Sequence, residues 1–163
     1  MIKIISQNKK AYHDYEILET YEAGLVLNGL EIKAIRAGKV NLTGSHARIL
    51  ESGIRNKVLG KNIKNPNSLY QIHNTEPELF LLGAHISVLD GDPIRTRKLL
   101  MHRREISKLI GRTQEKNLTL IPLKMYFKKG RAKIEIGLGR GKKLHDKREV
   151  IKKRYLDREQ SRG

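Results

Sequence analysis

The sequence of 163 residues has no cysteine and no tryptophan, and only two phenylalanines and four prolines. Because cysteine is absent, the chain can form no disulfide, no thiolate metal site and no cysteine nucleophile. No apolar run is long enough for a signal peptide or a membrane-spanning helix, so we expect a cytoplasmic protein. A chain of this length provides one domain and an extension.

The familiar catalytic and cofactor-binding motifs are also missing. The six histidines are far apart in the sequence, and none has a zinc-binding spacing. The glycine-rich stretch GLGRGKK lacks the spacing of a phosphate-binding loop, and no G-x-S-x-G motif occurs. Asp90 and Asp92 flank a glycine before a proline, which is typical of a turn. We therefore predict no enzymatic activity, no catalytic residue, no metal site and no cofactor.

Positive charge is the strongest compositional signal. The chain has 34 Lys and Arg against 17 Asp and Glu, a formal net charge of +17. Residues 139–163 hold ten basic and four acidic side chains, so the rest of the chain is also strongly basic. This excess favours a polyanionic partner, nucleic acid first and a membrane surface second. The few aromatic side chains favour recognition of structured RNA by its backbone and shape.

Hydrophobic patterns predict a mainly β fold with short helices. Residues 15–21 and 41–50 have the composition and alternation of strands, and residues 78–89 resemble a buried strand. A short helix over 30–38 would end at a capping glycine. An apolar stripe flanked by basic residues predicts an amphipathic helix over 96–113.

A hairpin is expected to close the body of the chain. Residues 119–127 and 131–138 alternate on either side of the turn KKG. We expect one face of each strand to be apolar, with Ile121, Leu123, Met125 and Phe127 on the first and Ala132, Ile134, Ile136 and Leu138 on the second.

Together these elements fit a small, closed or nearly closed antiparallel barrel over residues 1–138. Residues 52–78 show no period and are predicted to form a long loop, inserted into this barrel. Residues 139–163 are predicted to be a separate basic tail.

Several long stretches resemble the small protein B family of bacterial transfer-messenger RNA-binding proteins. They are NKKAYHDYEILETYEAGLVLNGLEIKAIRAGKVNL, DPIRTRKLLMHRREISKLIG, LTLIPLKMYFKKGRAKIEIGLGRGKK and LHDKRE. The resemblance covers nearly all of the chain except residues 52–78, where the family has a short turn. It implies a barrel of the oligonucleotide-binding (OB) type with peripheral helices. It also implies a role in trans-translation, the rescue of ribosomes stalled on messages without a usable stop codon.

By this resemblance, the protein binds the tRNA-like domain of transfer-messenger RNA and escorts it to the empty decoding site without performing bond chemistry. Lysines and arginines would bind phosphates, and Asn41 could bond a base edge or a 2′-hydroxyl. Glu22 could accept from a guanine edge or a 2′-hydroxyl or hold a neighbouring arginine in place, or it could be a locally salt-bridged turn residue. The residues that match the family's RNA-binding motifs are Glu22, Ala23, Gly24, Arg36, Gly38, Lys39, Asn41, Arg97, Lys98, Leu100 and His102.

The tail has its own predicted structure and role. Asp146 and Glu149 fit a capping box, so a helix should begin near Lys147. Its apolar stripe is too thin to dock firmly, and we expect the tail to be disordered when free and helical when bound. By resemblance it enters the decoding centre and messenger channel of the small ribosomal subunit. The residues expected there are Lys142, Lys143, His145, Asp146, Lys147 and Arg148.

The main alternative is a ribosomal or ribosome-assembly protein that uses the same barrel to bind ribosomal RNA. Such a protein would co-purify stoichiometrically with a subunit, whereas a rescue factor is expected to be monomeric when free and to select a tRNA-like RNA. A non-specific polyanion binder would show salt-dependent binding without preference among structured RNAs.

Overall fold

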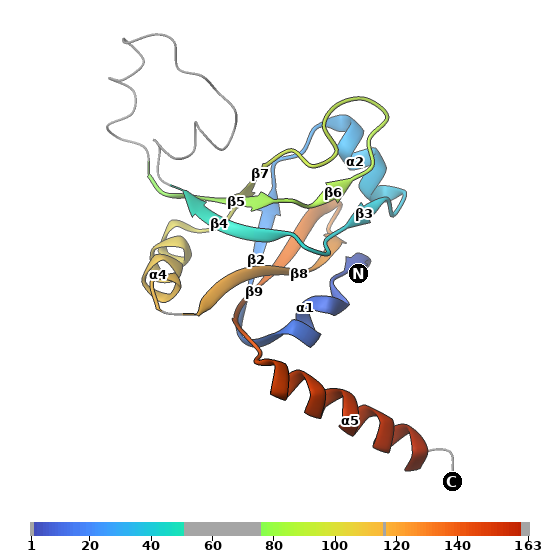
Figure 1. The fold of residues 1–163 in the computed structure, drawn as a ribbon. Helices are drawn as coiled ribbons and strands as arrows, with labels where there is room; N and C mark the ends of the chain where they lie inside the picture. Colours follow the sequence, from blue (N-terminus) through green and yellow to red (C-terminus); the bar gives the residue numbers. More distant parts are fainter. Residues whose placement is uncertain (1, 51–75, 116, 161–163) are drawn as a thin grey trace.

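The computed structural model describes residues 2–50, 76–115 and 117–160, which form a β-barrel with peripheral helices (Figure 1). The strands are β1 (Ile2–Gln7), β2 (Tyr15–Leu25), β3 (Val40–Asn41), β4 (His46–Leu50), β5 (Glu78–Leu82), β6 (His85–Ile86), β7 (Arg97–Leu100), β8 (Leu118–Lys128) and β9 (Arg131–Gly141). The helices are α1 (Lys9–Asp14), α2 (Gly29–Arg36), α4 (Arg103–Thr113) and α5 (Leu144–Gln160). None of these helices is long and apolar enough to cross a bilayer.

The main sheet closes on itself. Its strand order is β1-β8-β4-β5-β7-β2-β9, and β8 also pairs with β9, so the strands from β8 round to β9 form a ring. All its pairings are antiparallel, and the predicted barrel is therefore confirmed. The interior is filled by aliphatic side chains from every strand of the ring, among them Ala23, Ala47, Leu79, Leu99, Met125 and Ile134.

Most of the predicted elements are present with shifted ends. The strand predicted at 15–21 continues to Leu25, and the helix predicted at 30–38 is α2, followed by Gly38 with φ +74°. The strand predicted at 78–89 is two strands, β5 and β6. Most of the insertion predicted at 52–78 lies outside the described residues; β4 and β5, on either side of it, pair antiparallel from Leu50 and Glu78.

The helix predicted over 96–113 is wrong in its first part. Arg97 and Leu99 point into the barrel while Lys98 and Leu100 are more exposed, so this segment has the two-residue period of a strand. β7 pairs with β5 and β2, and the helix begins only at Arg103. A buried arginine on the inner face concealed the strand pattern.

The apolar face predicted for the first hairpin strand is divided by a β-bulge. The register of β8 and β9 shifts between Pro122 and Lys124, and this extra residue reverses the alternation of side chains. Met125 therefore lies in the main core, whereas Ile121 and Leu123 pack outside the barrel against Ala11 of α1. The prediction for β9 is confirmed for Ile134, Ile136 and Leu138, which lie in the main core, whereas Ala132 is only partly buried.

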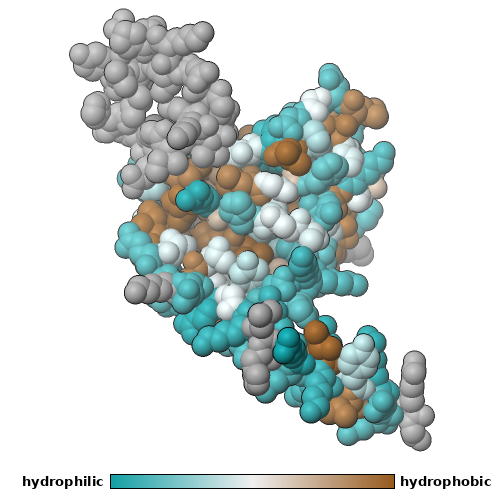
Figure 2. Space-filling model, in the orientation of Figure 1, coloured by the Kyte–Doolittle hydropathy of each residue, from teal (hydrophilic) through white to brown (hydrophobic). Residues whose placement is uncertain are grey.

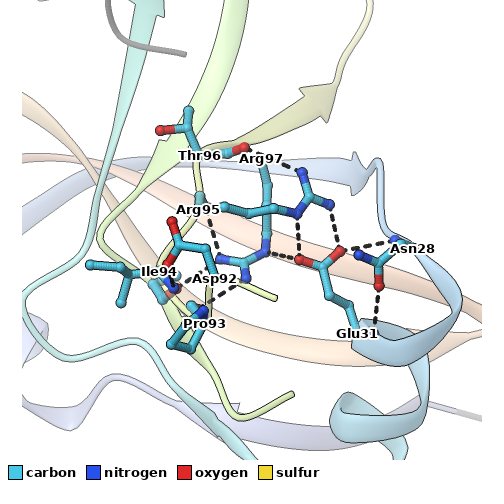
Figure 3. Close-up of polar contacts among 9 residues, drawn as sticks. Asn28, Glu31, Asp92, Pro93, Ile94, Arg95, Thr96 and Arg97 are labelled. Carbon is cyan, nitrogen blue, oxygen red and sulfur yellow. Dashed lines mark hydrogen bonds and ion pairs between the residues drawn. The ribbon is translucent and has the colours of Figure 1, made fainter. Parts of the chain in front are cut away.

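A buried ion-pair cluster connects α2 to β7 (Figure 3). The Glu31 side chain is 1% exposed and that of Arg97 is fully buried. Arg97 Nε donates to Glu31 Oε1 at 2.7 Å, and Arg95 Nε donates to the same oxygen at 2.8 Å. Glu31 also completes a capping box at the start of α2, because its Oε2 accepts from the Asn28 N–H while Asn28 Oδ1 accepts from the Glu31 N–H.

The remaining Arg97 donors bind the carbonyl oxygens of Ala84, Pro93 and Arg95 at 2.8 to 3.0 Å. The chain before and after β6, between β5 and β7, is therefore wrapped around this guanidinium. Burial acts to raise the pKa of Glu31, but hydrogen bonds from Arg95, the Asn28 backbone and Arg97 outweigh it and lower the pKa below its ordinary value. The carboxylate is charged at neutral pH and compensates the buried arginine.

The tail forms helix α5, which extends away from the barrel (Figure 1). It begins at Leu144 and not near Lys147 as predicted. Asp146 Oδ2 accepts from the Lys143 N–H at 3.3 Å, so Asp146 caps the helix from its third position instead of preceding it. The tail surface is mostly hydrophilic with separate apolar side chains (Figure 2). The expectation that the tail is disordered when free stays a prediction.

Replacing Glu31 by Gln should lower the free energy of unfolding by about 3–5 kcal/mol, because it leaves the Arg97 charge buried without a counter-charge. Urea denaturation followed by circular dichroism measures this change. The control is Arg95→Ala, which removes a partner whose side chain is 36% exposed and should cost about 1 kcal/mol or less. Equal losses for the two variants would contradict the role assigned to the buried pair.

Candidate nucleic-acid interface

A groove of about 330 Å³ lies where the end of β2, the end of β7, helix α2 and the β8–β9 turn meet. We call it the α2–hairpin groove. Its apolar lining comes from all four of these elements, and its cationic lining comes from α2 and β9. The lining residues are Gly24, Leu25, Leu27, Ile32, Arg36, Leu100, Phe127, Gly130, Arg131, Ala132 and Lys133.

The lining of this groove depends on a glycine and an aromatic ring. Gly24 pairs with Leu100, and a Cβ at Gly24 would lie only 3.3 Å from the Leu100 Cβ, so a larger residue would crowd this side of the groove. The Leu100 side chain is itself exposed. The Arg36 guanidinium lies 6.0 Å from the centre of the Phe127 ring, within the range of a cation–π contact. An apolar surface beside a stacked arginine suits the flat face of a nucleobase.

The Glu22 carboxylate holds two lysines of the hairpin, of which Lys133 lines the groove. Glu22 Oε2 accepts from the Tyr126 hydroxyl at 2.6 Å and from Lys128 Nζ at 2.9 Å, and Lys133 Nζ lies 3.7 Å from Glu22 Oε1. The Tyr126 hydrogen bond and Lys128 lower the pKa of Glu22, so it is ionised at neutral pH. Glu22 lies on a strand and not in a turn, and it holds two lysines rather than an arginine.

Only part of the predicted RNA-binding set meets at this groove. Gly24, Arg36 and Leu100 line it, and Glu22 adjoins it through Lys133. Gly38 and Lys39 lie in the turn between α2 and β3, and Asn41 is the second residue of β3. All three are exposed. Asn41 Oδ1 accepts from the Thr43 N–H at 2.8 Å, which holds the amide side chain at the surface.

The other four predicted residues, Ala23, Arg97, Lys98 and His102, do not line the groove. Ala23 and Arg97 have no exposed surface, so neither can contact RNA directly in this conformation. Arg97 has the structural role described above. Lys98 forms an ion pair with Glu78 on the outer face of the barrel, and His102 is the exposed residue before α4. The sequence motif therefore combines residues that line the groove with residues that support it.

Sequence reasoning missed the contribution of the hairpin to the groove. Lys129 and Gly130 both have positive φ, +50° and +74°, which makes a tight turn and brings Lys128 close to Arg131. Arg131 and Lys133 alternate with the residues predicted for the apolar face of this strand, and Arg131 is exposed. Two basic residues at alternate positions after a tight turn were the available signal.

The tail begins at the end of the hairpin that lies opposite its turn. β8 and β9 each have 11 residues, and their pairing runs from Lys128 and Arg131 at the turn to Leu118 and Arg140. At about 3.3 Å per residue, the root of the tail lies roughly 30 Å from the turn. Figure 1 shows α2 at one end of the barrel and α5 leaving from the other.

The tail residues differ in their surroundings. Lys142 and Lys147 contact α1, while Lys143, Asp146 and Arg148 are exposed. His145 lies in the first turn of α5, and its side chain is outside the described part of the structure. Within residues 2–50, 76–115 and 117–160, no three histidine or acidic side chains gather in a way that could hold a metal ion.

Comparison with known families gives a match over most of the sequence. The model of the family described as "SmpB protein" matches residues 5–78 and 61–163. The SsrA-binding protein of a Nitratiruptor species is 49% identical over 166 residues, covering 97% of this chain and 94% of that protein. The SsrA-binding protein of Anoxybacillus flavithermus is 52% identical over 167 residues, covering 99% of this chain and 92% of that protein.

A solved structure has the same fold. It is described as "tmRNA-SmpB: a journey to the center of the bacterial ribosome", and its matching chain is 40% identical with a TM-score of 0.61. The match covers 90% of this chain and 93% of that chain.

Replacing Tyr126 by Phe should raise the pKa of Glu22 toward its ordinary value of 4.5, because the hydroxyl is the strongest influence that lowers it. Carbon-detected NMR titration of the Glu22 carboxyl measures the shift. Tyr12→Phe is the matched control, since Tyr12 lies near Lys124 and Glu135 and not beside Glu22. An unchanged Glu22 pKa in Tyr126→Phe would show that this hydroxyl does not hold the carboxylate.

Proposed function

Because the chain belongs to the SmpB protein family, we propose that it binds the tRNA-like domain of transfer-messenger RNA and delivers this RNA to stalled ribosomes. The α2–hairpin groove is the RNA-binding face of the barrel. The tail acts separately, in the decoding centre and messenger channel of the small subunit. The protein performs no bond chemistry of its own and requires no cofactor.

The observation that carries this proposal is the separation of two basic regions along one hairpin. The groove lies at the turn between β8 and β9, and the tail leaves from the opposite end, roughly 30 Å away. A protein with both regions at one end would present a single surface. With the two regions at opposite ends, one molecule can contact two RNA surfaces at the same time.

The chemistry of the groove suits a folded RNA with an unstacked base. Leu100 and Phe127 provide apolar surface for a base, and Arg36 can stack or bind a phosphate. Arg131 and Lys133 place positive charge beside this surface, where a backbone would pass. The predicted contacts of Gly38, Lys39 and Asn41 extend this face beyond α2.

The tail suits a channel lined with RNA. Residues 139–163 contain ten basic side chains, and the described part of α5 has no broad apolar face that would pack on the barrel. In the decoding centre, His145 is proposed to stack on a base, and Lys147 and Arg148 to replace part of the electrostatic environment of the missing message. Lys142 and Lys143 directly precede this helix, and Asp146 lies in its first turn.

Binding to three RNAs tests the function directly. The full chain is titrated with the tRNA-like domain of transfer-messenger RNA, an ordinary tRNA and a random duplex, at two salt concentrations. The proposal requires a preference for the first RNA that persists at the higher salt, because non-specific binding loses affinity steeply with salt. No preference, together with stoichiometric co-purification with a ribosomal subunit, would favour a ribosomal or assembly protein instead.

Replacing Lys133 by Glu should weaken binding to the tRNA-like domain about tenfold or more, because it removes a cation from the groove and adds a repulsive charge. Arg48→Glu is the control, since it makes the same change of net charge on the exposed face of β4. Its effect on affinity should be no more than about threefold. Equal losses in the two variants would mean that net charge, and not the groove, determines binding.

Replacing Lys147 and Arg148 together by Ala should abolish peptide tagging on stalled ribosomes and leave binding to the free tRNA-like domain nearly unchanged. The reason is the distance between the tail and the groove. Tagging in a reconstituted translation system and a filter-binding titration give the two values. A parallel loss of both would contradict the division between barrel and tail.

A further inference from the structure

The Glu22 carboxylate connects three neighbouring strands of the barrel. Glu22 lies on β2, and β9 pairs with β2 on one side and with β8 on the other. With neighbouring strands about 4.8 Å apart, β2 and β8 are separated by roughly 10 Å. The carboxylate nevertheless accepts from Tyr126 and Lys128 of β8, and it lies 3.7 Å from Lys133 Nζ of β9. All three strands contribute residues to the α2–hairpin groove.

Tyr126 is the rigid member of this network. Its neighbours Met125 and Phe127 belong to the main core or pack against it, so Tyr126 lies on the outer side of the sheet, yet it is only 4% exposed. A tyrosine has two side-chain torsions, whereas a lysine has a flexible four-carbon stem. Burial and the hydrogen bond with Glu22 raise the pKa of Tyr126, so its hydroxyl is protonated at neutral pH and donates.

The lysine contacts alone are too weak to hold this arrangement. The side chains of Lys128, Lys133 and Glu22 are 43%, 30% and 36% exposed. A partly exposed ion pair changes an equilibrium by no more than about fivefold. A hydrogen bond from a buried hydroxyl to a charged carboxylate changes it by roughly tenfold or more. The pKa of Glu22 follows the same order, because the Tyr126 hydrogen bond lowers it more than Lys128 does. Tyr126 therefore sets the position of the carboxylate, and the lysines follow it.

The two lysines stay available to RNA while Glu22 holds them. An ammonium group has three donors, so Lys128 and Lys133 can each contact the carboxylate and still bind a phosphate. Because both side chains are already ordered by Glu22, RNA binding costs less side-chain entropy. This advantage exists only for an RNA whose phosphates match the spacing of the two ammonium groups.

We propose that Tyr126 is a positioning residue for RNA recognition, which through Glu22 holds the Lys128 and Lys133 ammonium groups at the spacing of two phosphates in a folded RNA. The inference rests on the proposed function, since it adds how the groove region selects its RNA. Tyr126 has almost no exposed surface and acts through the other three side chains. It affects the choice among RNAs more than the affinity for polyanions in general, because non-specific binding uses lysines in any position.

Tyr126→Phe removes the hydroxyl and keeps the ring. The variant is titrated with the tRNA-like domain and with an ordinary tRNA at several salt concentrations. The preference for the tRNA-like domain should fall about fivefold to tenfold, with less than about a twofold change in affinity for ordinary tRNA. The slope of log affinity against log salt for the tRNA-like domain should decrease by about one, because one phosphate contact is lost. A loss of stability alone would not change this slope while the variant remains folded.

A second tyrosine–glutamate–lysine network provides the matched control. The Tyr21 hydroxyl donates to Glu19 on the same strand, and Glu19 accepts from Lys108 of α4 at 3.0 Å. None of these three residues lines the groove. Tyr21→Phe therefore removes the same kind of hydrogen bond and should leave both the preference and the salt slope unchanged.

A double-substitution cycle tests whether Tyr126 acts through Glu22. Once Glu22→Ala has removed the carboxylate, the Tyr126 hydroxyl has nothing to position. Adding Tyr126→Phe to Glu22→Ala should therefore cause no further loss of preference.

Nitrogen-15 NMR of the lysine ammonium groups measures the positioning in the free protein, without RNA. The order parameters of the Lys128 and Lys133 ammonium groups should fall in Tyr126→Phe, because their carboxylate is no longer fixed. The order parameter of the Lys108 ammonium group, which Glu19 holds, should not change.

The outcomes distinguish this inference from the proposed function. Unchanged lysine order or an unchanged salt slope in Tyr126→Phe would overturn the role of Tyr126 and leave the RNA-binding function intact. An equal loss of preference in Tyr21→Phe, or a further loss in the Glu22→Ala background, would overturn it as well. Failure of the unsubstituted chain to prefer the tRNA-like domain would overturn the proposed function, and with it the part of Tyr126 in RNA recognition, whatever the lysine order shows.

Discussion

The Glu31 carboxylate joins helix α2 to a segment far away in the sequence, β7 and the loop before it, and the shape of the groove depends on it. It caps α2, pairs with the fully buried Arg97 on β7, and binds Arg95 in the preceding loop. A buried guanidinium is costly unless every donor is satisfied, so Glu31 and the surrounding carbonyls constrain one another. The consequence is a fixed position of α2 against the end of β7. Arg36 and Leu100, which line the groove from these two elements, are thereby held in place.

The long β8–β9 hairpin provides the second constraint. Its two strands pair with each other from the turn to Leu118 and Arg140, and β9 also pairs with β2 over most of its length, so the two ends of the hairpin are held apart. The turn contributes Arg131 and Lys133 to the groove, and the other end carries the tail and the α1 contact. The positive charge of the chain is thus divided between a rigid surface and an extended helix. This arrangement explains why a small basic protein ends in a helix that does not pack on its own core.

Sequence patterns predicted the barrel because its alternating strands and tight turns are local signals. They failed at Arg97 because an arginine in a sequence pattern indicates an exposed position, whereas this arginine is buried. The residues of β7 were therefore assigned to an amphipathic helix. They failed at Leu123 because a β-bulge reverses the alternation without any change in composition. The resemblance predicted Gly24, Arg36 and Leu100 as RNA-binding residues, and all three line the groove. The hairpin residues reach the same groove only because the barrel closes, which no local pattern in the sequence indicates. Contacts such as that of Asp14 with Lys147 join residues far apart in the sequence and have no local signal.

Hydrogen–deuterium exchange of the full chain, with and without the isolated tRNA-like domain, tests the central claim most directly. The claim is that the barrel binds this RNA through the groove while the tail stays available to the ribosome. The account predicts new protection in α2, at the ends of β2 and β7, and at the turn between Lys128 and Arg131, with none in α5. Protection concentrated in α5 and α1, with the hairpin turn unchanged, would contradict it.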